Sequence, residues 1–325
     1  MQTITKSIDI TKTSYIEIHY PLESTLLFDI ETTGFSPDYT SLYLIGYMYY
    51  NLATKSWYIT QLFNDDGNSE QEMLETFAKE LANYSYLISF NGDGFDIPYL
   101  LKKADKYNLS IDFCSILSID MYKLVRPLKK FLYLDNLKLK TIEIYLDIYR
   151  EDKYSGGDLI NIYKGYLINK DPISYKLLLQ HNFEDIGDML ALSDILAYKD
   201  LLDGKFHVQK YSVENEYLLL DIELLSSIPK RLAKSMDHII INGIDNHLVI
   251  KVPILEDILK FYFKDYKNYY FLPAEGKAIH KSVATYVDKE YRIKATPNTC
   301  YVNHKGAFIL QYDKKYQGYK YNYED

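Results

Sequence analysis

Four acidic residues in three short segments of this chain have the pattern of a site for divalent metal ions. Two divalent cations need several clustered oxygen ligands, which a single carboxylate cannot supply. A metal pair held in this way can catalyse the hydrolysis of a phosphodiester bond. The sequence therefore predicts a two-metal phosphodiesterase site. Its four carboxylates are Asp29 and Glu31 in the segment 27–34, Asp96 in the segment 91–98 and Asp185 in the segment 181–185.

The first two carboxylates belong to a predicted strand. Asp29 and Glu31 are two residues apart, so both side chains leave the same face of the strand. Burying both without a partner would be costly, and a bound cation would remove that cost. The alternative is a strand end at which both carboxylates simply reach water. Asp96 lies at the start of a predicted helix, where the helix dipole favours a negative charge. Its alternative role is that of an ordinary N-terminal helix carboxylate.

A histidine accompanies the last carboxylate. His181 and Asp185 are four residues apart on a predicted helix and therefore lie on one face of it. Beside a metal-binding carboxylate, His181 is a candidate to deprotonate or orient the attacking water. The alternative is a surface histidine, or one whose hydrogen bonds are satisfied in the core. Glu184 and Asp188 are predicted to point away from this face and to meet solvent.

The elements that must position these residues form an α/β pattern. Apolar runs predict strands over residues 25–30, 42–50, 57–63 and 86–90. Helical spacing predicts helices over residues 69–84, 96–106, 133–149 and 174–202. Gly156-Gly157 is expected to break the chain, and Asp158 to cap a short helix after it. We therefore expect a central mixed β-sheet flanked by helices.

The sequence pattern changes after residue 203. Residues 208–225 and 238–252 are typical of β-hairpins, with Asn242-Gly243 and Asp245-Asn246 as candidate turns. The segment from residue 257 onward is rich in aromatic residues and lysine. These features predict a catalytic domain over residues 1–203 and a small α+β accessory domain over residues 204–325.

Composition indicates an ordinary globular protein. Of the 325 residues, 47% are hydrophobic and 25% charged, a balance that can bury a core. The formal net charge of −8 argues against a general nucleic-acid coat protein but not against a nuclease. The two cysteines have no zinc-like spacing and are expected to be buried or partly buried thiols. The first residues do not resemble a signal peptide, and no apolar stretch is long enough to span a bilayer, so we expect a cytoplasmic protein without membrane partners.

Three motifs carry a resemblance to a known superfamily. Residues 28–34, Asn91-x3-Phe95-Asp96 and His181-Asn182-x2-Asp185 resemble the exonuclease motifs of the DEDD superfamily, 3′–5′ exonucleases of RNase H-like fold. The resemblance covers about residues 22–203. Segments 134–143 and 150–157 are similar to YprB-like ribonuclease H-like proteins. The resemblance implies that Asp29, Glu31, Asp96 and Asp185 bind two Mg²⁺ or Mn²⁺ ions.

The third motif departs from the usual superfamily pattern. The superfamily usually has Tyr four residues before the last Asp or His five residues before it, whereas His181 stands four before Asp185. One residue along a helix turns a side chain by about 100°. The departure therefore concerns the general-base role of His181 and leaves the carboxylate ligands unchanged.

Residues beside the carboxylates are the predicted substrate contacts. Thr32 and Thr33 precede a turn at which a strand end could approach backbone amides, while Asn91 and Phe95 precede Asp96. Phe95 could stack on a terminal base or pack in the core. Two groups of basic residues could hold phosphates, or could be solvated surfaces. They are Lys102, Lys103 and Lys106, and Lys123, Arg126, Lys129 and Lys130.

The leading hypothesis is a metal-dependent exonuclease that removes nucleotides from the 3′ end of single-stranded DNA or RNA. One alternative is a nucleic-acid-binding module that has the same fold without turnover. Loss of a metal carboxylate would indicate such a module, and all four carboxylates are present. A second alternative is a metal-dependent endonuclease on the same fold.

Overall fold

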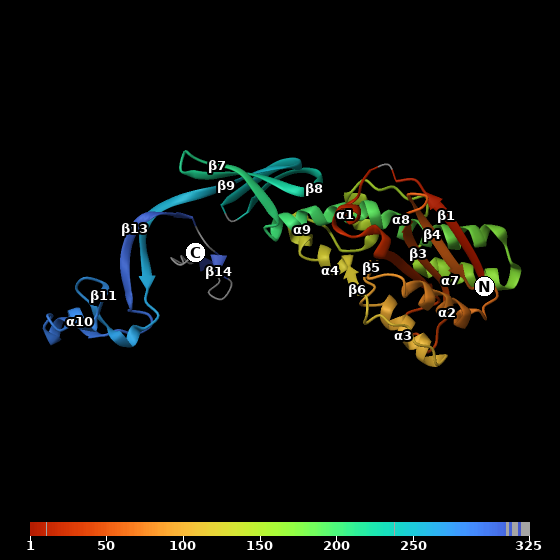
Figure 1. The fold of residues 1–325 in the computed structure, drawn as a ribbon, viewed down its shortest axis with the longest axis horizontal. Helices are drawn as coiled ribbons and strands as arrows, with labels where there is room; N and C mark the ends of the chain where they lie inside the picture. Colours follow the sequence, from red (N-terminus) through yellow and green to blue (C-terminus); the bar gives the residue numbers. More distant parts are fainter. Residues whose placement is uncertain (11, 237, 310–311, 314–317, 320–325) are drawn as a thin grey trace. The chain divides into compact units, whose positions relative to one another are not determined.

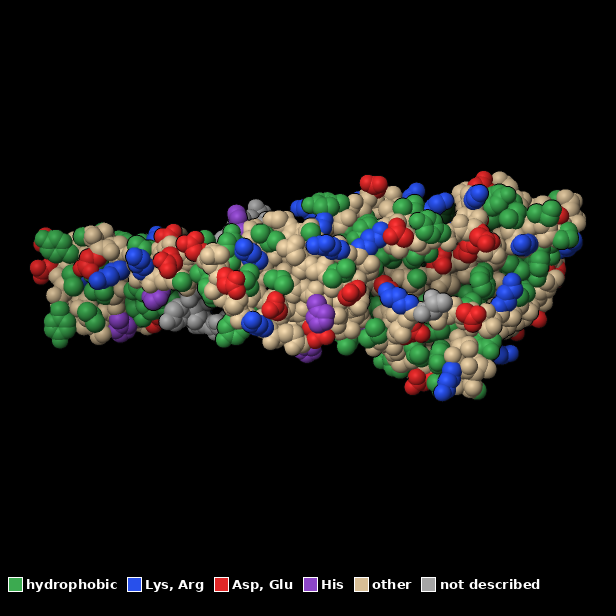
Figure 2. Space-filling model, turned by 90° about the horizontal axis from the view of Figure 1, so that it is seen from above, with side chains coloured by type: hydrophobic (Ala, Val, Ile, Leu, Met, Phe, Trp, Pro, Cys, Tyr) green, Lys and Arg blue, Asp and Glu red, His purple; other side chains and the backbone are tan. Residues whose placement is uncertain are grey.

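The chain folds into two compact units, each described here by itself (Figure 1). The computed structural model describes residues 1–10, 12–236, 238–309, 312–313 and 318–319. The first unit contains Met1–His207 together with Leu224–Arg231 and Ile244–Asn246. The second unit contains the described residues of Val208–Glu223, Leu232–Gly243 and His247–Asp325. Figure 2 shows one face of the molecule, on which basic and acidic side chains are interspersed.

A six-stranded mixed sheet forms the centre of the first unit and confirms the predicted fold class. Its strand order is β1-β4-β3-β2-β5-β6. Strands β1 to β4 pair antiparallel, and β5 and β6 continue the sheet parallel to β2. The strands are β1 (Gln2–Ile8), β2 (Thr25–Thr32), β3 (Leu42–Asn51), β4 (Ser56–Phe63), β5 (Tyr86–Ser89) and β6 (Leu117–Asp120).

Two of these strands, β1 and β6, were not predicted from the sequence. Both lie at the edges of the sheet. Most residues of β1 are exposed, so the strand lacks the continuous apolar run that marks the central strands. Strand β6 has only four residues, with its first residue exposed. Edge strands need little apolar surface, because only one side of each is covered by another strand.

Helices pack on both faces of the sheet. One face of β2, including Leu26 and Phe28, packs in a core cluster with α2 (Glu70–Leu81) and α3 (Asp96–Lys106). On the opposite side, Tyr43 and Phe63 pack against α7 (Gly156–Asn169) and α8 (Pro172–Leu192). Because side chains alternate along a strand, Asp29 and Glu31 leave β2 on the face opposite Leu26 and Phe28, which is the face of α8.

The helices differ from the predicted ones in three places. The predicted helix 174–202 is divided by a short 3₁₀ turn at Ser193–Ile195. Within 133–149, the main helix is α6 (Leu139–Tyr145). Gly156-Gly157 does not break the chain but begins α7, because Ser155 and Asp158 form a reciprocal capping box there. The remaining α-helices of this unit are α1 (Tyr15–His19), α4 (Met121–Val125), α5 (Leu128–Leu132) and α9 (Leu196–Leu202).

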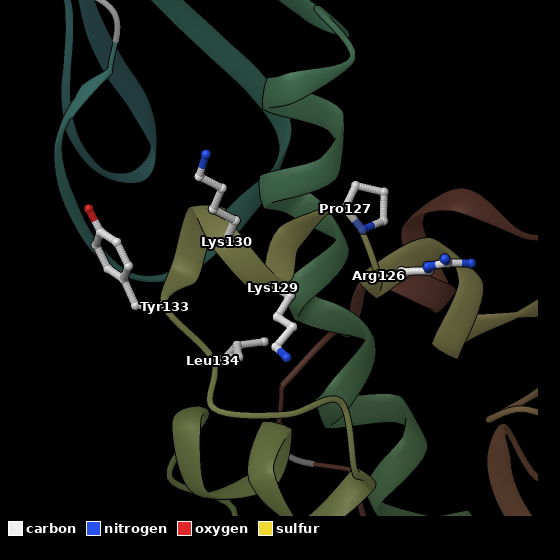
Figure 3. A pocket seen from close by; sticks show the side chains of 6 residues that line it. All are labelled: Arg126, Pro127, Lys129, Lys130, Tyr133 and Leu134. Atoms are coloured by element: carbon white, nitrogen blue, oxygen red, sulfur yellow. The ribbon is translucent and has the colours of Figure 1, made fainter.

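Helices α4 and α5 are two short helices joined at Pro127 (Figure 3). Pro127 has no backbone N–H and therefore favours the start of a new helix over continuation of the first. Helix α5 ends at Tyr133, which has a left-handed backbone with φ of 56°. This turn brings the chain into the segment that precedes α6.

Antiparallel strands dominate the C-terminal region, where the α-helical part of the predicted α+β fold is small. The strands are β7 (Phe206–Glu214), β8 (Tyr217–Met236), β9 (Ile239–Tyr262), β10 (Tyr269–Leu272), β11 (Lys277–His280), β12 (Ile293–Lys294), β13 (Tyr301–Ile309), β14 (Tyr312–Asp313) and β15 (Gly318–Tyr319). They form sheets ordered β13-β9-β8-β7 and β11-β10-β12, with a separate β14-β15 pair. Helix α10 (Lys281–Ala284) is the short α-helix of this region.

Two further sequence expectations were wrong, one about the turns of this region and one about the burial of Cys114. Asn242-Gly243 and Asp245-Asn246 lie inside β9 and are not turns. The turn between β7 and β8 is at Asn215-Glu216, whose positive φ angles of 49° and 64° suit a tight hairpin.

Both cysteines are free thiols, but Cys114 is exposed while Cys300 is buried. Among the described residues, none of the helices has both the length and the apolar character needed to span a membrane.

Candidate nuclease site

Strand β2 and helix α8 bring the first predicted site residues together. Asn182 of α8 is fully buried and donates a hydrogen bond from Nδ2 to Asp29 Oδ2 at 3.0 Å. Its Oδ1 accepts a hydrogen bond from Gln61 Nε2 at 3.0 Å. These two bonds hold Asn182 between β4 and β2, so the Asp29 carboxylate has a fixed position under α8.

Gly46 allows this close approach of helix and sheet. It is the register partner of Asp29 on the neighbouring strand β3. A Cβ atom at position 46 would lie 2.0 Å from Asn182 Oδ1 and 2.3 Å from Ile186 Cδ1. Atoms cannot approach so closely, so any side chain here would displace the Asn182 and Ile186 side chains or α8 itself. The absence of a side chain at Gly46 is therefore a structural condition for the site.

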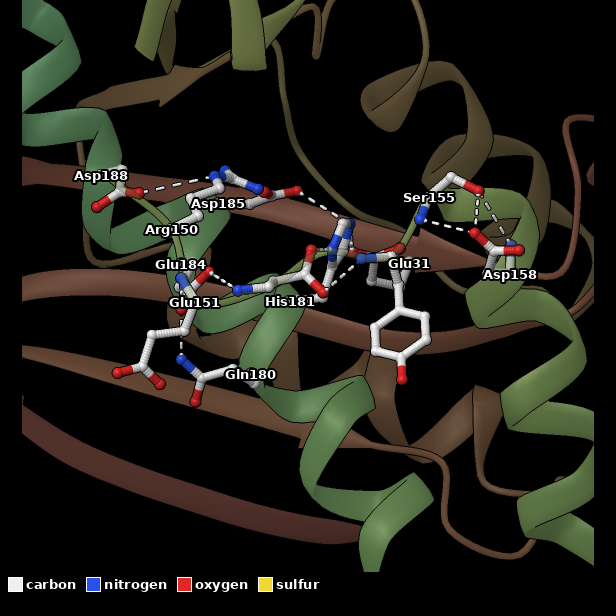
Figure 4. Close-up of polar contacts among 12 residues, drawn as sticks. Glu31, Arg150, Glu151, Ser155, Asp158, Gln180, His181, Glu184, Asp185 and Asp188 are labelled. Carbon is white, nitrogen blue, oxygen red and sulfur yellow. Dashed lines mark hydrogen bonds and ion pairs between the residues drawn. The ribbon is translucent and has the colours of Figure 1, made fainter. Parts of the chain in front are cut away.

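His181 lies between two of the predicted carboxylates (Figure 4). Its Nε2 is 3.5 Å from Glu31 Oε1 and 3.5 Å from Asp185 Oδ2. The other Glu31 oxygen accepts a hydrogen bond from the Tyr43 hydroxyl at 3.3 Å. Ligand atoms of Glu31, His181 and Asp185 lie within 4.8 Å of one another, close enough to hold one metal ion. The spacing of His181 and Asp185 therefore does place both on the face of α8 that meets β2.

Asp96 reaches the same region from the start of α3. Its carboxylate is 5% exposed and accepts a hydrogen bond from the Ile30 backbone N–H at 3.2 Å. Ile30 lies between Asp29 and Glu31, so this bond ties the first turn of α3 to the carboxylate-bearing part of β2. Burial raises the pKa of Asp96 to about 7, and the charges of Asp120 and Asp185 act in the same direction.

The carboxylates repel one another in a buried setting. Burial raises the pKa of Asp29 well above its ordinary value, and the neighbouring charges of Asp96, Asp185 and Glu31 add to the shift. Burial also raises the pKa of Glu31 to about 7. Burial lowers the pKa of His181, but the carboxylates of Glu31, Asp185 and Asp152 outweigh this effect and raise it overall. The four carboxylates of the cluster, when ionised, therefore carry more negative charge than a protonated His181 can balance.

The loop at residues 150–152 supports the site, and the carboxylate motifs did not identify it. Asp152 Oδ2 is 2.6 Å from His181 Nδ1. Because a carboxylate only accepts, this contact assigns the proton to Nδ1 when the imidazole is neutral. The Arg150 guanidinium pairs with Asp185. The resemblance of residues 150–157 to known ribonuclease H-like proteins was the only sequence signal for this loop.

Glu184 and Asp188 face this loop, and the prediction that they meet solvent was wrong. Glu184 accepts backbone hydrogen bonds from Glu151 and Asp152 at 3.2 and 3.0 Å. Asp188 Oδ2 is buried and lies 3.7 Å from Arg150 Nε (Figure 4). Arg150 also contacts the buried Glu143 at 2.7 Å. The loop is thus held by acidic residues that lie outside the predicted ligand set.

A cleft of about 500 Å³ opens beside two of the carboxylates, Asp29 and Asp185. Its lining includes the predicted residues Asp29, Asn91 and Asp185. Sequence reasoning missed Tyr122 and Lys138 as lining residues, because nothing in the sequence shows that the segment between β6 and α6 returns to the site. The full lining is Asp29, Phe90, Asn91, Tyr122, Leu137, Lys138, Leu139 and Asp185.

The other predicted substrate contacts, Thr32, Thr33 and Phe95, interact with neighbouring residues of the protein. The Thr32 hydroxyl donates to the Gly34 carbonyl at 2.8 Å, and the Thr33 hydroxyl accepts from the Ser41 backbone N–H at 2.8 Å. Phe95 is half-buried, with its ring near those of Phe35 and Tyr99. Roles for these three residues in substrate binding stay predictions.

The donor set fits divalent cations of the magnesium class. Carboxylate oxygens are the ligands that Mg²⁺ and Mn²⁺ prefer. Burial, with added repulsion between the carboxylates, raises the pKa values of Asp29, Glu31 and Asp96, and a bound cation would offset both effects by stabilising the charged carboxylates. The residues that could hold such ions are Asp29, Glu31, Asp96 and Asp185, with His181 beside them.

Comparison with known proteins places this site in a family. A model of the RNase H superfamily matches residues 26–197, the stretch that contains β2, α3 and α8. The chain belongs to the RNase H superfamily. All four predicted metal-binding carboxylates and His181 lie inside the matched residues of this superfamily member.

The chain is also similar to parts of two DNA polymerases and to most of one nuclease structure. It is 28% identical over 159 residues to DNA polymerase 1 of Aeropyrum pernix, a match that covers 46% of this chain but only 16% of the polymerase. A family B DNA polymerase structure from Pyrobaculum calidifontis matches with a TM-score of 0.40 and 14% identity, covering 75% of this chain and 35% of the polymerase. A structure described as the apo form of a nuclease matches with a TM-score of 0.35 and 15% identity, covering 57% of this chain and 76% of the nuclease.

Proposed function

We propose that this RNase H superfamily member is a metal-dependent 3′–5′ exonuclease that hydrolyses phosphodiester bonds at the 3′ end of single-stranded nucleic acid. The proposal depends on one observation above all. Four carboxylates from β2, α3 and α8, distant in sequence, lie close enough to interact, and two of them, Asp29 and Asp185, line one cleft. Burial together with mutual repulsion raises the pKa of Asp29, Glu31 and Asp96. The resemblance of the three motifs to those of DEDD-superfamily 3′–5′ exonucleases supports 3′–5′ polarity. We keep the division into residues 1–203 and 204–325 as part of the proposal.

The residues of the chain have distinct roles in this proposal. Divalent cations bound by the carboxylates would polarise the scissile phosphate and lower the pKa of a bound water. Asp152 accepts a hydrogen bond from the Nδ1–H of His181, which leaves Nε2 directed at Glu31 and Asp185. In the neutral imidazole, Nε2 is then the atom that accepts a proton from the attacking water. Asn182 fixes Asp29, and Arg150 fixes Asp185, so that the ligands do not have to reorganise during the reaction.

The decisive test is digestion with 3′- and 5′-labelled single-stranded DNA and RNA in parallel, with Mn²⁺ and with EDTA. We expect metal-dependent release of mononucleotides from the 3′ end, and loss of that release in Asp29→Asn. Cleavage of a circular single strand would instead indicate an endonuclease. Binding without cleavage in Mg²⁺ and Mn²⁺ would indicate a non-catalytic module and would overturn the proposal.

A further inference from the structure

A second hollow of the first unit, of about 520 Å³, is lined by cations at the turn between α4 and α5 (Figure 3). Arg126, Lys129 and Lys130 are all exposed there. Among the described residues, none of the three forms an ion pair, and the lining contains no acidic residue. The full lining is Arg126, Pro127, Lys129, Lys130, Tyr133 and Leu134.

These cations differ from two basic residues of the neighbouring elements, which are paired with acids. Lys123, only three residues before Arg126, is 2.6 Å from Asp93, and Lys103 is 2.8 Å from Glu70. In a chain with a net charge of −8, a hollow that collects three cations and no acid has a local potential opposite to that of the whole protein. It would therefore attract an anion.

The geometry favours an extended anion over a small one. Figure 3 shows that the side chains of Arg126, Lys129 and Lys130 leave the turn in different directions and do not converge on one point. A single phosphate would need converging donors, whereas a polynucleotide presents successive phosphates along its backbone. The ring of Tyr133, which is 78% exposed, adds an aromatic surface of the kind on which single-stranded bases stack.

The hollow is connected to the nuclease cleft by the same segment of chain. Tyr122 lines the cleft and Arg126 lines the hollow, and four residues apart they lie on one face of the helical turn. On the returning chain, Leu134 lines the hollow and Leu137 lines the cleft. Three residues of chain span at most about 10 Å. A strand that leaves the cleft can therefore reach the hollow within a few nucleotides.

We propose that the α4–α5 turn is a binding site for the single-stranded polynucleotide upstream of its 3′ end, with Arg126, Lys129 and Lys130 holding phosphates and Tyr133 stacking a base. The inference rests on the proposed function for the direction of the strand. This binding site raises the affinity of the protein for long strands. It does not read sequence, because phosphates and base faces are common to all sequences.

Fluorescence anisotropy tests the site without requiring turnover. The probe is a labelled oligothymidylate of about 15 nucleotides, bound in EDTA at several salt concentrations to wild type and to Lys129→Glu/Lys130→Glu. The matched control is Lys164→Glu/Lys176→Glu, which makes the same change of charge at exposed positions on α7 and α8. Melting curves establish that each double variant is folded.

We expect the Lys129/Lys130 variant to bind about tenfold or more weakly, with a salt slope smaller by about 1.4, since each single-strand phosphate contact contributes about 0.7. The control should keep most of the affinity. Wild-type affinity in the Lys129/Lys130 variant, or an equal loss in the control, would overturn the proposal. Activity provides a separate readout: kcat/KM for the long strand should fall at least about tenfold more than that for a small nitrophenyl phosphodiester, which occupies only the cleft. A wild type that binds the strand through these lysines but cleaves neither substrate would refute the exonuclease and leave the binding site.

Discussion

The substitution Gly46→Ala tests whether the close contact between β3 and α8 sets the geometry of the site. The added Cβ would lie 2.0 Å from Asn182 Oδ1, where an ordinary contact begins at 3.4 Å. The helix or the Asn182 side chain must therefore move by about 1.4 Å. Ile186 Cδ1, at 2.3 Å from the same Cβ, must move as well. Because Asn182 donates to Asp29, the displacement is expected to lengthen or break that hydrogen bond.

The magnitude follows from the cost of overpacking a core. Such substitutions destabilise a protein by about 1–3 kcal/mol. For a domain of this size, each kcal/mol lowers the melting temperature by about 2–4 °C, so we expect a fall of roughly 2–12 °C. Misplacement of a catalytic group by about 1 Å can cost about a hundredfold in rate. The loss of turnover should therefore be much larger than the loss of folded protein at the assay temperature.

The assay compares thermal melting with hydrolysis of the labelled 3′ end in Mn²⁺. Gly165→Ala is the matched control, because Gly165 lies inside α7 and a Cβ there meets no atom within 4 Å. Alanine is favoured over glycine in a helix by about 1 kcal/mol, so this control should be at least as stable as wild type and fully active. Wild-type melting and turnover in Gly46→Ala would show that α8 does not depend on this contact.

Three further outcomes are expected. Millimolar Mn²⁺ should raise the melting temperature of wild type above its value in EDTA, because ions that bind only the folded state stabilise it; Asp29→Asn should show a smaller rise, and equal midpoints in wild type would contradict an ion site. In EDTA, stability should fall as pH rises from the ordinary carboxyl pKa values, 4.5 for Glu31 and 3.8 for Asp96, to their raised values of about 7. The reason is that the folded state binds more protons than the unfolded chain in this range. Asp96→Asn should weaken this pH dependence, and a melting temperature of wild type that stays constant or rises would contradict it. His181→Ala should lower turnover by about 10²–10⁴ while the Mn²⁺-induced rise in melting temperature is kept, and His181→Tyr should retain more activity; a loss of only a few-fold would remove His181 from proton transfer.

The central elements of the first unit were predictable because their signals are local. The apolar run ending at Asp29 and Glu31 marks a buried strand, and its alternation alone places both carboxylates on one face. Helix α3 begins at Asp96 as predicted, since Pro98 in the first turn is compatible with a helix start. The four-residue spacing of His181 and Asp185 predicted a shared helical face. Each of these inferences needs only the repeat of one element.

Contacts between distant segments had no comparable signal in a single sequence. Nothing around Gly46 shows that Asn182 will lie against it, and nothing around Asp152 shows that His181 will be its partner. The turn at Pro127, which carries Arg126, Lys129 and Lys130, became visible as a hollow only when α4 and α5 were in place. The sequence by itself therefore determined which residue types could bind metal and which face of its element each occupies. Only the tertiary structure decided which faces meet, because that depends on side-chain packing between segments more than 100 residues apart, such as Asp29 and Asn182.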